Sequence, residues 1–255
     1  TVTIEPYDFE HPGKIPCVTG YDLMIALGGD GTLLRAGHIA AEQGIPVLGI
    51  QAGHLGFLVE LTLDNWKEVL PQLLRGEYRL ERRLMLNATL EREGTVIGSW
   101  DVINELVISR GRTVRPIEVR VDLREGYLTS YIADGLIVAT ATGSTAYALA
   151  VGGPILPPEL RSMLILPIAP HLSLDRAVVL AEGARVILRT RAEHDVVLSV
   201  DGMEPISVKD EDRVLVQASP NSLNMLRFGS PNYFYRGLAQ MMRRNPAIRM
   251  VNDDD

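Results

Sequence analysis

The chain has 255 residues, of which 46% are hydrophobic and 22% are charged, and its formal net charge is −7. This composition is typical of a globular protein, the length allows two domains, and the negative charge argues against a protein that wraps nucleic acid. The single cysteine, Cys17, excludes an internal disulfide and a cysteine-rich zinc site. Because the chain shows neither a signal peptide nor an apolar stretch of about 18 residues, we expect a cytoplasmic protein that does not enter a membrane.

The first regular elements are predicted on either side of a glycine-rich turn, Gly28-Gly29-Asp30-Gly31. The apolar run Leu23–Leu27 before it predicts a buried, central strand of a parallel sheet. Apolar residues at helical spacing follow up to Ala41, and Pro46–Ile50 predicts a second strand. Strand, helix and strand within about 30 residues form a βαβ unit, so ligands are expected at the carboxyl ends of these strands.

The residues of this turn indicate a phosphate-binding loop with chemistry of its own. Gly28, Gly29 and Gly31 let the backbone approach a bound group, and Thr32 is predicted to cap a helix whose N-terminus favours an anion. The Asp30 carboxylate would repel a polyphosphate unless it accepts a proton or holds a cation. The alternative is that Asp30 only caps a turn.

The loop after the second strand, Gln51–Leu58, leaves the sheet on the same side as the glycine-rich turn. Phe57 could offer a flat ring to a nucleotide base. His54 could carry a proton, but a loop histidine with no visible partner is more often a structural hydrogen-bonding residue.

From Leu84 onward the pattern changes to the alternation of half-buried antiparallel strands, most clearly in Ile117–Leu123. Short strands separated by turn residues follow as far as Val216. We therefore predict an α/β domain with a Rossmann-like parallel sheet (1–82) and a mostly-β, sandwich-like domain (83–224). A C-terminal segment (225–255), helical over Tyr235–Arg244, is predicted to return to the first domain.

Two polar residues, Asn104 and Glu105, lie inside the otherwise apolar run Val102–Ile108. Burying an amide and a carboxylate together is unfavourable unless other groups satisfy them. The two side chains could grip hydroxyl groups of a ligand. Alternatively, the run could be an edge strand with one polar face in water.

A third motif extends from Asp134 to Tyr147, where an apolar strand leads into Thr142-Gly143-Ser144-Thr145 and the start of a helix. Small residues and hydroxyl groups allow a bulky polar ligand to come close, and Tyr147 offers both a ring and a hydroxyl. An ordinary strand, turn and helix would pack poorly with so many of these residues. In that alternative, Tyr147 would be a core residue.

Together, the glycine-rich turn, Asn104-Glu105 and Thr142–Tyr147 resemble the three motifs of the NAD kinase family, in that family's order and spacing. The resemblance extends from about Asp22 to about Met242. Lipid kinases and 6-phosphofructokinases share only the first motif. The resemblance implies transfer of a terminal phosphoryl group to the 2′-hydroxyl of the adenosine ribose of NAD, giving NADP. It also implies a divalent cation, with Mg²⁺ expected, a donor that is ATP or another polyphosphate, and a homodimer or homotetramer.

The resemblance also assigns site residues. Asp30 would be the general base, with Gly31 and Phe57 lining the site. Asn104 and Glu105 would hold the adenosine, and Asp134 the nicotinamide amide. Thr145, Ala146 and Tyr147 would contact the adenine. Ala150 and the basic residue Arg115 are the remaining predicted contacts of NAD. A cleft between the two domains is expected to hold the ligand, and the metal ligands stay unknown.

The chain departs from the family pattern at Met203, where many members have glutamine, and at Ile132, where some strictly NAD-using members have arginine. The choice between NAD and NADH therefore stays open. Two other functions remain alternatives: a lipid or sphingoid-base kinase built on the same loop, and a non-catalytic sensor of NAD or NADP. Asn104, Glu105 and Tyr147 argue against the first, and the presence of Asp30 argues against the second.

Overall fold

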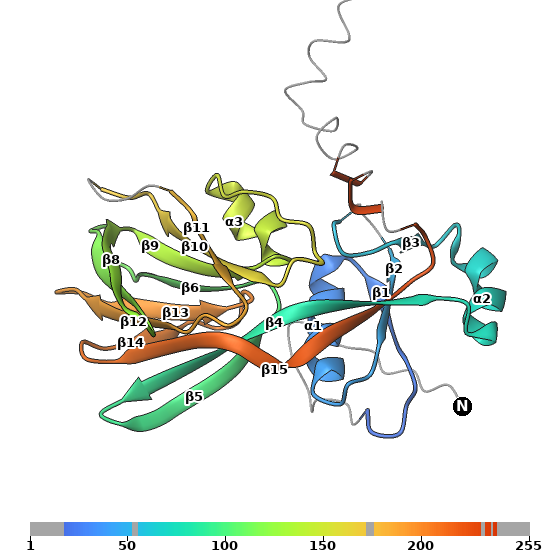
Figure 1. The fold of residues 1–255 in the computed structure, drawn as a ribbon, viewed down its shortest axis with the longest axis horizontal. Coiled ribbons are helices and arrows are strands. Elements are labelled where there is room, and N and C mark those ends of the chain that lie inside the picture. Colours follow the sequence, from blue (N-terminus) through green and yellow to red (C-terminus); the bar gives the residue numbers. More distant parts are fainter. Residues whose placement is uncertain (1–17, 53–55, 172–175, 231–232, 236, 239–255) are drawn as a thin grey trace, which may run out of the picture. The chain divides into compact units, whose positions relative to one another are not determined.

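The computed structural model describes residues 18–52, 56–171, 176–230, 233–235 and 237–238, and the chain divides into two compact units (Figure 1). We call the described part of Thr1–Glu81 and Leu223–Asp255 the α/β unit, and Arg82–Ser222 the β unit. The long strands β4 (Arg79–Arg92) and β15 (Arg213–Arg227) each contribute residues to both units. As limits of functional domains, the boundaries predicted after residues 82 and 224 stay predictions.

The α/β unit begins with a parallel βαβ unit, as predicted. Strands β1 (Met24–Gly28) and β2 (Val47–Gln51) are parallel, with Met24 opposite Val47, and helix α1 (Asp30–Ala41) connects them. Strand β3 (Leu61–Thr62) pairs in parallel with β2. Helix α2 (Trp66–Arg75) ends at Gly76, whose positive φ of 73° places it in the left-handed region, where glycine is favoured. The carboxyl ends of β1 and β2 therefore lie at one edge of the sheet.

The prediction that the first strand is central and buried is wrong. Among the described strands β1 pairs only with β2, so it lies at the edge of its sheet. Ala26 is buried and α1 packs against β1, whereas Ile25 is 50% and Leu27 62% exposed. A run of apolar residues locates a strand, but it does not determine how many neighbours the strand has.

The β unit is a sandwich of two sheets in which β5–β15 pair mainly with antiparallel neighbours, in agreement with the predicted fold class. One sheet has β15, β12, β7 and β8 in that order, with the β4–β5 hairpin paired to β15. The other has the order β11-β10-β9-β6-β13-β14. The strands not yet given bounds are β5 (Thr95–Val102), β6 (Glu105–Arg110), β7 (Ile117–Leu123), β8 (Gly126–Ala133), β9 (Gly135–Thr140), β10 (Ser162–Ile168), β11 (Val178–Ala181), β12 (Val186–Arg191), β13 (Val196–Val200) and β14 (Ile206–Val208).

One hydrophobic core fills the β unit, and both sheets contribute to it. On β7, Ile117, Val119 and Val121 point into this core, as their alternation with polar residues predicted. A 3₁₀ turn (Gly143–Thr145) and the short helix α3 (Tyr147–Ala150) follow β9. Ala148 of α3 packs on a smaller cluster with residues of β9 and β10. The third sequence motif is thus the strand, turn and helix that was expected.

The last described residues, 233–235 and 237–238, are helical, and most of the predicted helix Tyr235–Arg244 lies outside the described residues. Among the helices that the structure describes, none has the length and apolar character needed to cross a membrane.

Candidate active site

Asp30 is the first residue of α1, directly after the carboxyl end of β1. Its carboxylate accepts hydrogen bonds from two successive backbone N–H groups in the loop after β2, from Phe57 (2.8 Å) and from Leu58 (3.2 Å). One oxygen receives each bond, so the plane of the carboxylate is fixed. Asp30 also lies in the first turn of α1, at the positive end of the helix dipole. Asp30 is thus a carboxylate held in one orientation at the carboxyl ends of the parallel strands, where ligands are expected.

Two glycines are required by close contacts around this aspartate. A Cβ on Gly56 would lie 2.1 Å from Asp30 Oδ1, so a side chain there would displace the carboxylate. A Cβ on Gly28 would lie 2.3 Å from Thr32 Oγ1. Thr32 therefore packs against the turn, and the prediction that it caps α1 is wrong: Gly29 is the N-cap residue, with no side-chain cap hydrogen bond.

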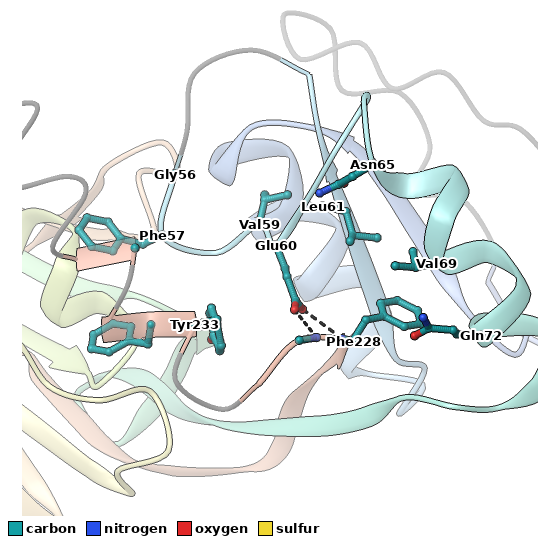
Figure 2. A pocket seen from close by; sticks show the side chains of 13 residues that line it. Gly56, Phe57, Val59, Glu60, Leu61, Asn65, Val69, Gln72, Phe228 and Tyr233 are labelled. Atoms are coloured by element: carbon teal, nitrogen blue, oxygen red, sulfur yellow. Dashed lines mark hydrogen bonds between the residues drawn. The ribbon is translucent and has the colours of Figure 1, made fainter.

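A cavity of about 540 Å³ in the α/β unit begins at these same loop residues (Figure 2). Gly56 and Phe57 line it, together with aromatic side chains that include Phe228 and Tyr233. Glu60 accepts hydrogen bonds from the backbone N–H groups of Phe228 and Gly229, drawn as dashed lines in Figure 2. The predicted ligand contact Phe57 therefore lies both at the cavity wall and beside Asp30. His54 lies outside the described residues.

In the β unit, the predicted pair Asn104-Glu105 does not lie within one strand: Asn104 is in a turn and Glu105 is the first residue of the strand that follows. Strand β5 ends at Val102 and β6 begins at Glu105. One carboxylate holds this turn, because Asp201 accepts hydrogen bonds from the backbone N–H groups of Ile103, Asn104 and Glu105, at 2.7, 2.8 and 2.9 Å. β6 lies between β9 and β13, so the edge-strand alternative is wrong.

Glu105 is a buried carboxyl group with a raised pKa. Burial, and next the negative charge of Asp201, raise the pKa of its carboxyl from the ordinary 4.5 to about 7, although a backbone hydrogen bond from Tyr147 acts in the opposite direction. Glu105 Oε2 is buried and makes no hydrogen bond among the described residues. An unsatisfied buried acceptor is costly without a ligand, and it fits a group that receives a hydroxyl from a bound molecule.

The third motif packs directly on the Asn104 turn. Thr140 donates its hydroxyl to the carbonyl of Ile103 (2.6 Å), and its N–H donates to the carbonyl of Asn104 (2.8 Å). A Cβ on Gly143 would lie 2.1 Å from that same Asn104 oxygen, so only glycine fits. The structure therefore brings Asn104, Glu105 and the start of α3 together, as the resemblance implied.

Tyr147 is 42% exposed, so the alternative that it is a core residue is wrong. Thr145 and Ala146 are half-buried and Ala150 is exposed. Thr145 donates its hydroxyl to the carbonyl of Thr142 (3.1 Å). The ring of Tyr147 is therefore available to a ligand at the surface of this motif.

Two predicted contacts lie in other parts of the β unit. Asp134, between β8 and β9, forms an ion pair with Arg110 (3.2 Å). Arg115 is exposed in the loop before β7, and its carbonyl accepts a hydrogen bond from the ring of His194. These contacts do not involve the Asn104 turn or Tyr147, and the assignment of both residues to NAD stays a prediction.

The sequence marked Asp201-Gly202 only as a turn and as part of the family resemblance, and it assigned Asp201 no role. The available signal was an aspartate followed by glycine at the end of an apolar strand: Asp201 has a positive φ of 47°, which Asp tolerates better than most residues. Arg83 was also missed. It is 2% exposed and donates to the hydroxyl of Thr142 (3.3 Å), so it supports the third motif from β4.

Comparison with known proteins agrees with this geometry. The model of the ATP-NAD kinase N-terminal domain matches residues 10–78, and that of the ATP-NAD kinase C-terminal domain matches residues 103–228. An NAD kinase of Chloroflexus aggregans is 42% identical over 228 residues, with 89% of this chain and 83% of the relative covered. One of Symbiobacterium thermophilum is 40% identical, with 87% and 78% covered.

The chain belongs to the NAD kinase family. Among solved structures, yeast NADH kinase complexed with NADH superposes with a TM-score of 0.81 at 28% identity, covering 89% of this chain and 67% of the yeast chain. An NAD kinase from Archaeoglobus fulgidus in complex with ATP has a TM-score of 0.73 at 22% identity, with 87% and 83% covered, and supports the fold.

Membership of the NAD kinase family confirms the resemblance seen in the three motifs and the prediction of a phosphotransferase that acts on NAD. The two-part α/β and β-sandwich fold is confirmed as well. A lipid kinase and a non-catalytic sensor are not favoured, because whole-chain relatives are NAD kinases.

Proposed function

We propose that the chain makes NADP from NAD, with Asp30 as the general base that accepts the proton of the adenosine 2′-hydroxyl. As the O–H bond breaks, the hydroxyl oxygen attacks the terminal phosphorus of the donor, and the shortened polyphosphate leaves with the electron pair of the broken P–O bond. The observation that carries this proposal is the Asp30 carboxylate, held at the start of α1 by the N–H groups of Phe57 and Leu58. Phosphoryl transfer depends mainly on positioning and on charge neutralisation.

The acceptor is proposed to lie against the Asn104 turn and the start of α3. The unpartnered Oε2 of Glu105 would accept a ribose hydroxyl, and the exposed ring of Tyr147 would stack on the adenine, with Thr145, Ala146 and Ala150 beside it. That one NAD molecule contacts both these residues and Asp30 stays a prediction, as does the role of Asp134 at the nicotinamide amide. NADH is a second acceptor to test, because the yeast relative was solved with NADH.

The donor is proposed to be ATP, as the description of the matched family indicates. Gly28, Gly29, Gly31 and Thr32 form the turn at the start of α1, where backbone N–H groups and the helix dipole favour phosphate oxygens. Among the described residues, no three carboxylate, histidine or cysteine side chains are grouped closely enough to hold a metal ion. This fits Mg²⁺, which is commonly held by one or two carboxylates together with substrate phosphates. A bound Mg²⁺ would neutralise charge on those phosphates.

The test is an assay of NADP formation with NAD, Mg²⁺ and, in turn, ATP, other nucleoside triphosphates and inorganic polyphosphate. Asp30→Asn should lower kcat by roughly 10²–10⁴, while NAD binding, measured by calorimetry, stays within about threefold. The amide has the size of the carboxylate, but it cannot accept the proton and its single oxygen can keep only one of the two backbone hydrogen bonds. A variant that retained about a tenth of the wild-type rate or more would show that Asp30 is not the base. Sedimentation velocity would test the predicted homodimer or homotetramer.

A further inference from the structure

Arg227, the last residue of β15, is a cation inside the α/β unit, since its relative exposure is only 2%. Its charge is balanced by Glu81, at an N–O distance of 3.1 Å. Tyr233 donates its hydroxyl to the same Glu81 oxygen (2.8 Å), accepts from Arg227 Nη2 (3.0 Å), and places its ring centroid 4.5 Å from the guanidinium. A buried charge persists only when such partners satisfy it. The guanidinium is therefore held in one orientation.

Another contact of Arg227 leads to the proposed base. Arg227 Nη1 donates to the backbone carbonyl of Leu58 at 2.9 Å. The N–H of the same residue, Leu58, donates to Asp30 Oδ1, and the N–H of Phe57 donates to Oδ2. The backbone of a single residue thus connects the buried guanidinium to the Asp30 carboxylate. No residue of the three sequence motifs supplies this support.

We propose that Arg227 is a positioning residue for phosphoryl transfer: it fixes the Phe57–Leu58 backbone so that its two N–H groups aim the Asp30 carboxylate. The inference rests on the proposed role of Asp30 as the base. Small displacements of a reacting group lower the rate steeply. Arginine suits this task because its donors point in several fixed directions, toward Glu81, Tyr233 and Leu58 at once.

A purely structural role for this buried ion pair makes a different prediction, and Arg79 provides the matched control. Arg79 approaches the same Glu81 (3.5 Å) and lies 5.6 Å from the ring centroid of the same Tyr233. Arg79 donates to the backbone carbonyl of Gly229 (3.3 Å), which lies outside the loop that holds Asp30. If charge balance around Glu81 were all that mattered, the two lysine variants should differ in melting temperature, because Arg227 is 2% and Arg79 32% exposed, but both should keep kcat.

The experiment compares Arg227→Lys with Arg79→Lys in the full chain, measuring kcat, KM for NAD and the thermal melting temperature. Arg227→Lys keeps the positive charge beside Glu81 but loses the donor to Leu58, so kcat should fall about tenfold or more, with KM for NAD within about threefold. Arg79→Lys should keep kcat within about twofold of wild type. A folded Arg227→Lys with unchanged kcat, or an equal loss in both variants, would overturn the proposal.

A second measurement does not depend on turnover. Amide hydrogen exchange of the segment containing Phe57 and Leu58 should speed up in Arg227→Lys and not in Arg79→Lys, because only the first releases the loop. If Arg227→Lys fails to fold, Tyr233→Phe, which removes only the hydroxyl shared by Arg227 and Glu81, is used in its place and should show the same two changes at smaller size. Unchanged exchange and kcat in that variant would contradict the proposal.

The two proposals can fail separately. If Arg227 acts through Asp30, the double variant Asp30→Asn/Arg227→Lys should be no more than about twofold slower than Asp30→Asn alone, because the losses are not additive within one functional group of residues. Full additivity would refute the positioning role while leaving Asp30 as the base. A fast Asp30→Asn enzyme would instead refute the proposed base, whereas the exchange experiment would still report whether Arg227 holds the loop.

Discussion

Replacing Glu105 by glutamine should stabilise the ligand-free protein at alkaline pH and at the same time weaken its binding of NAD. In the folded chain, burial and the Asp201 charge raise the pKa of Glu105 to about 7, from the ordinary 4.5. Because the folded state binds this proton more tightly than the unfolded state does, the contribution of Glu105 to the free energy of unfolding is greatest below pH 4.5. It falls as the pH rises from 4.5 to about 7, and it changes no further above that range.

The size of the effect follows from the two pKa values. The interval from 4.5 to about 7, at about 1.4 kcal/mol for each pH unit, corresponds to about 3 kcal/mol of lost stability at pH 8. Glutamine cannot ionise, so the variant avoids this loss. Its amide occupies the position of Oε2, which has no hydrogen-bond partner among the described residues, and this lowers the expected net gain to about 1–3 kcal/mol. NAD affinity should fall by roughly 1.5–3 kcal/mol, the scale of a charged hydrogen bond.

Urea denaturation of the wild type and of Glu105→Gln, without NAD, at several pH values from 5 to 8.5 would measure this difference. The other titrating groups are common to both proteins, so they cancel in the comparison. The unfolding free energy of the variant, relative to that of the wild type, should rise by about 2–3 kcal/mol between pH 5 and pH 8.5, and the variant should be the more stable protein at the upper end. A constant difference across this range, or a less stable variant at pH 8, would refute the reasoning from burial and from the Asp201 charge.

Two further substitutions test the neighbouring motif. Tyr147→Ala should weaken NAD binding by roughly 1–3 kcal/mol, the scale of a lost base–aromatic stack. The melting temperature of the ligand-free protein should stay nearly unchanged, because Tyr147 is 42% exposed. Thermal melts with and without saturating NAD separate the two effects, and a large drop in the ligand-free melting temperature would count against a binding role. Gly143→Ala should cost about 1–3 kcal/mol of stability, because its Cβ would lie 2.1 Å from the Asn104 carbonyl oxygen. Gly183→Ala is the control, since nothing lies within 4 Å of the added Cβ, and equal losses in urea melts of the two alanine variants would contradict the close-contact argument.

Local sequence patterns were sufficient to predict much of the fold and the kinase family. Apolar alternation located β7 and the strands after it, because a strand that is buried on one face imposes a period of two. The βαβ unit around Asp30 followed from a short apolar run, a glycine-rich turn and a helical pattern. The residues and the spacing of the three motifs were enough to predict membership of the NAD kinase family, without any information on contacts between them.

Tertiary structure decided what local patterns cannot encode, namely which distant groups satisfy one another. Edge or interior position depends on how many neighbours a strand acquires. Among the described strands, β1 lies at an edge although its sequence is apolar, and β6 lies inside a sheet although it begins with Glu105. The pKa of Glu105 is raised first by burial and next by Asp201, almost one hundred residues away in the chain. The sequence singled out Asp30 because a carboxylate in a phosphate-binding turn would repel the phosphate unless it accepts a proton or holds a cation. That its carboxylate is aimed by Phe57 and Leu58, and that Leu58 is held by Arg227, depends on chain segments that meet only after folding, since hydrogen bonds have no fixed spacing along the sequence.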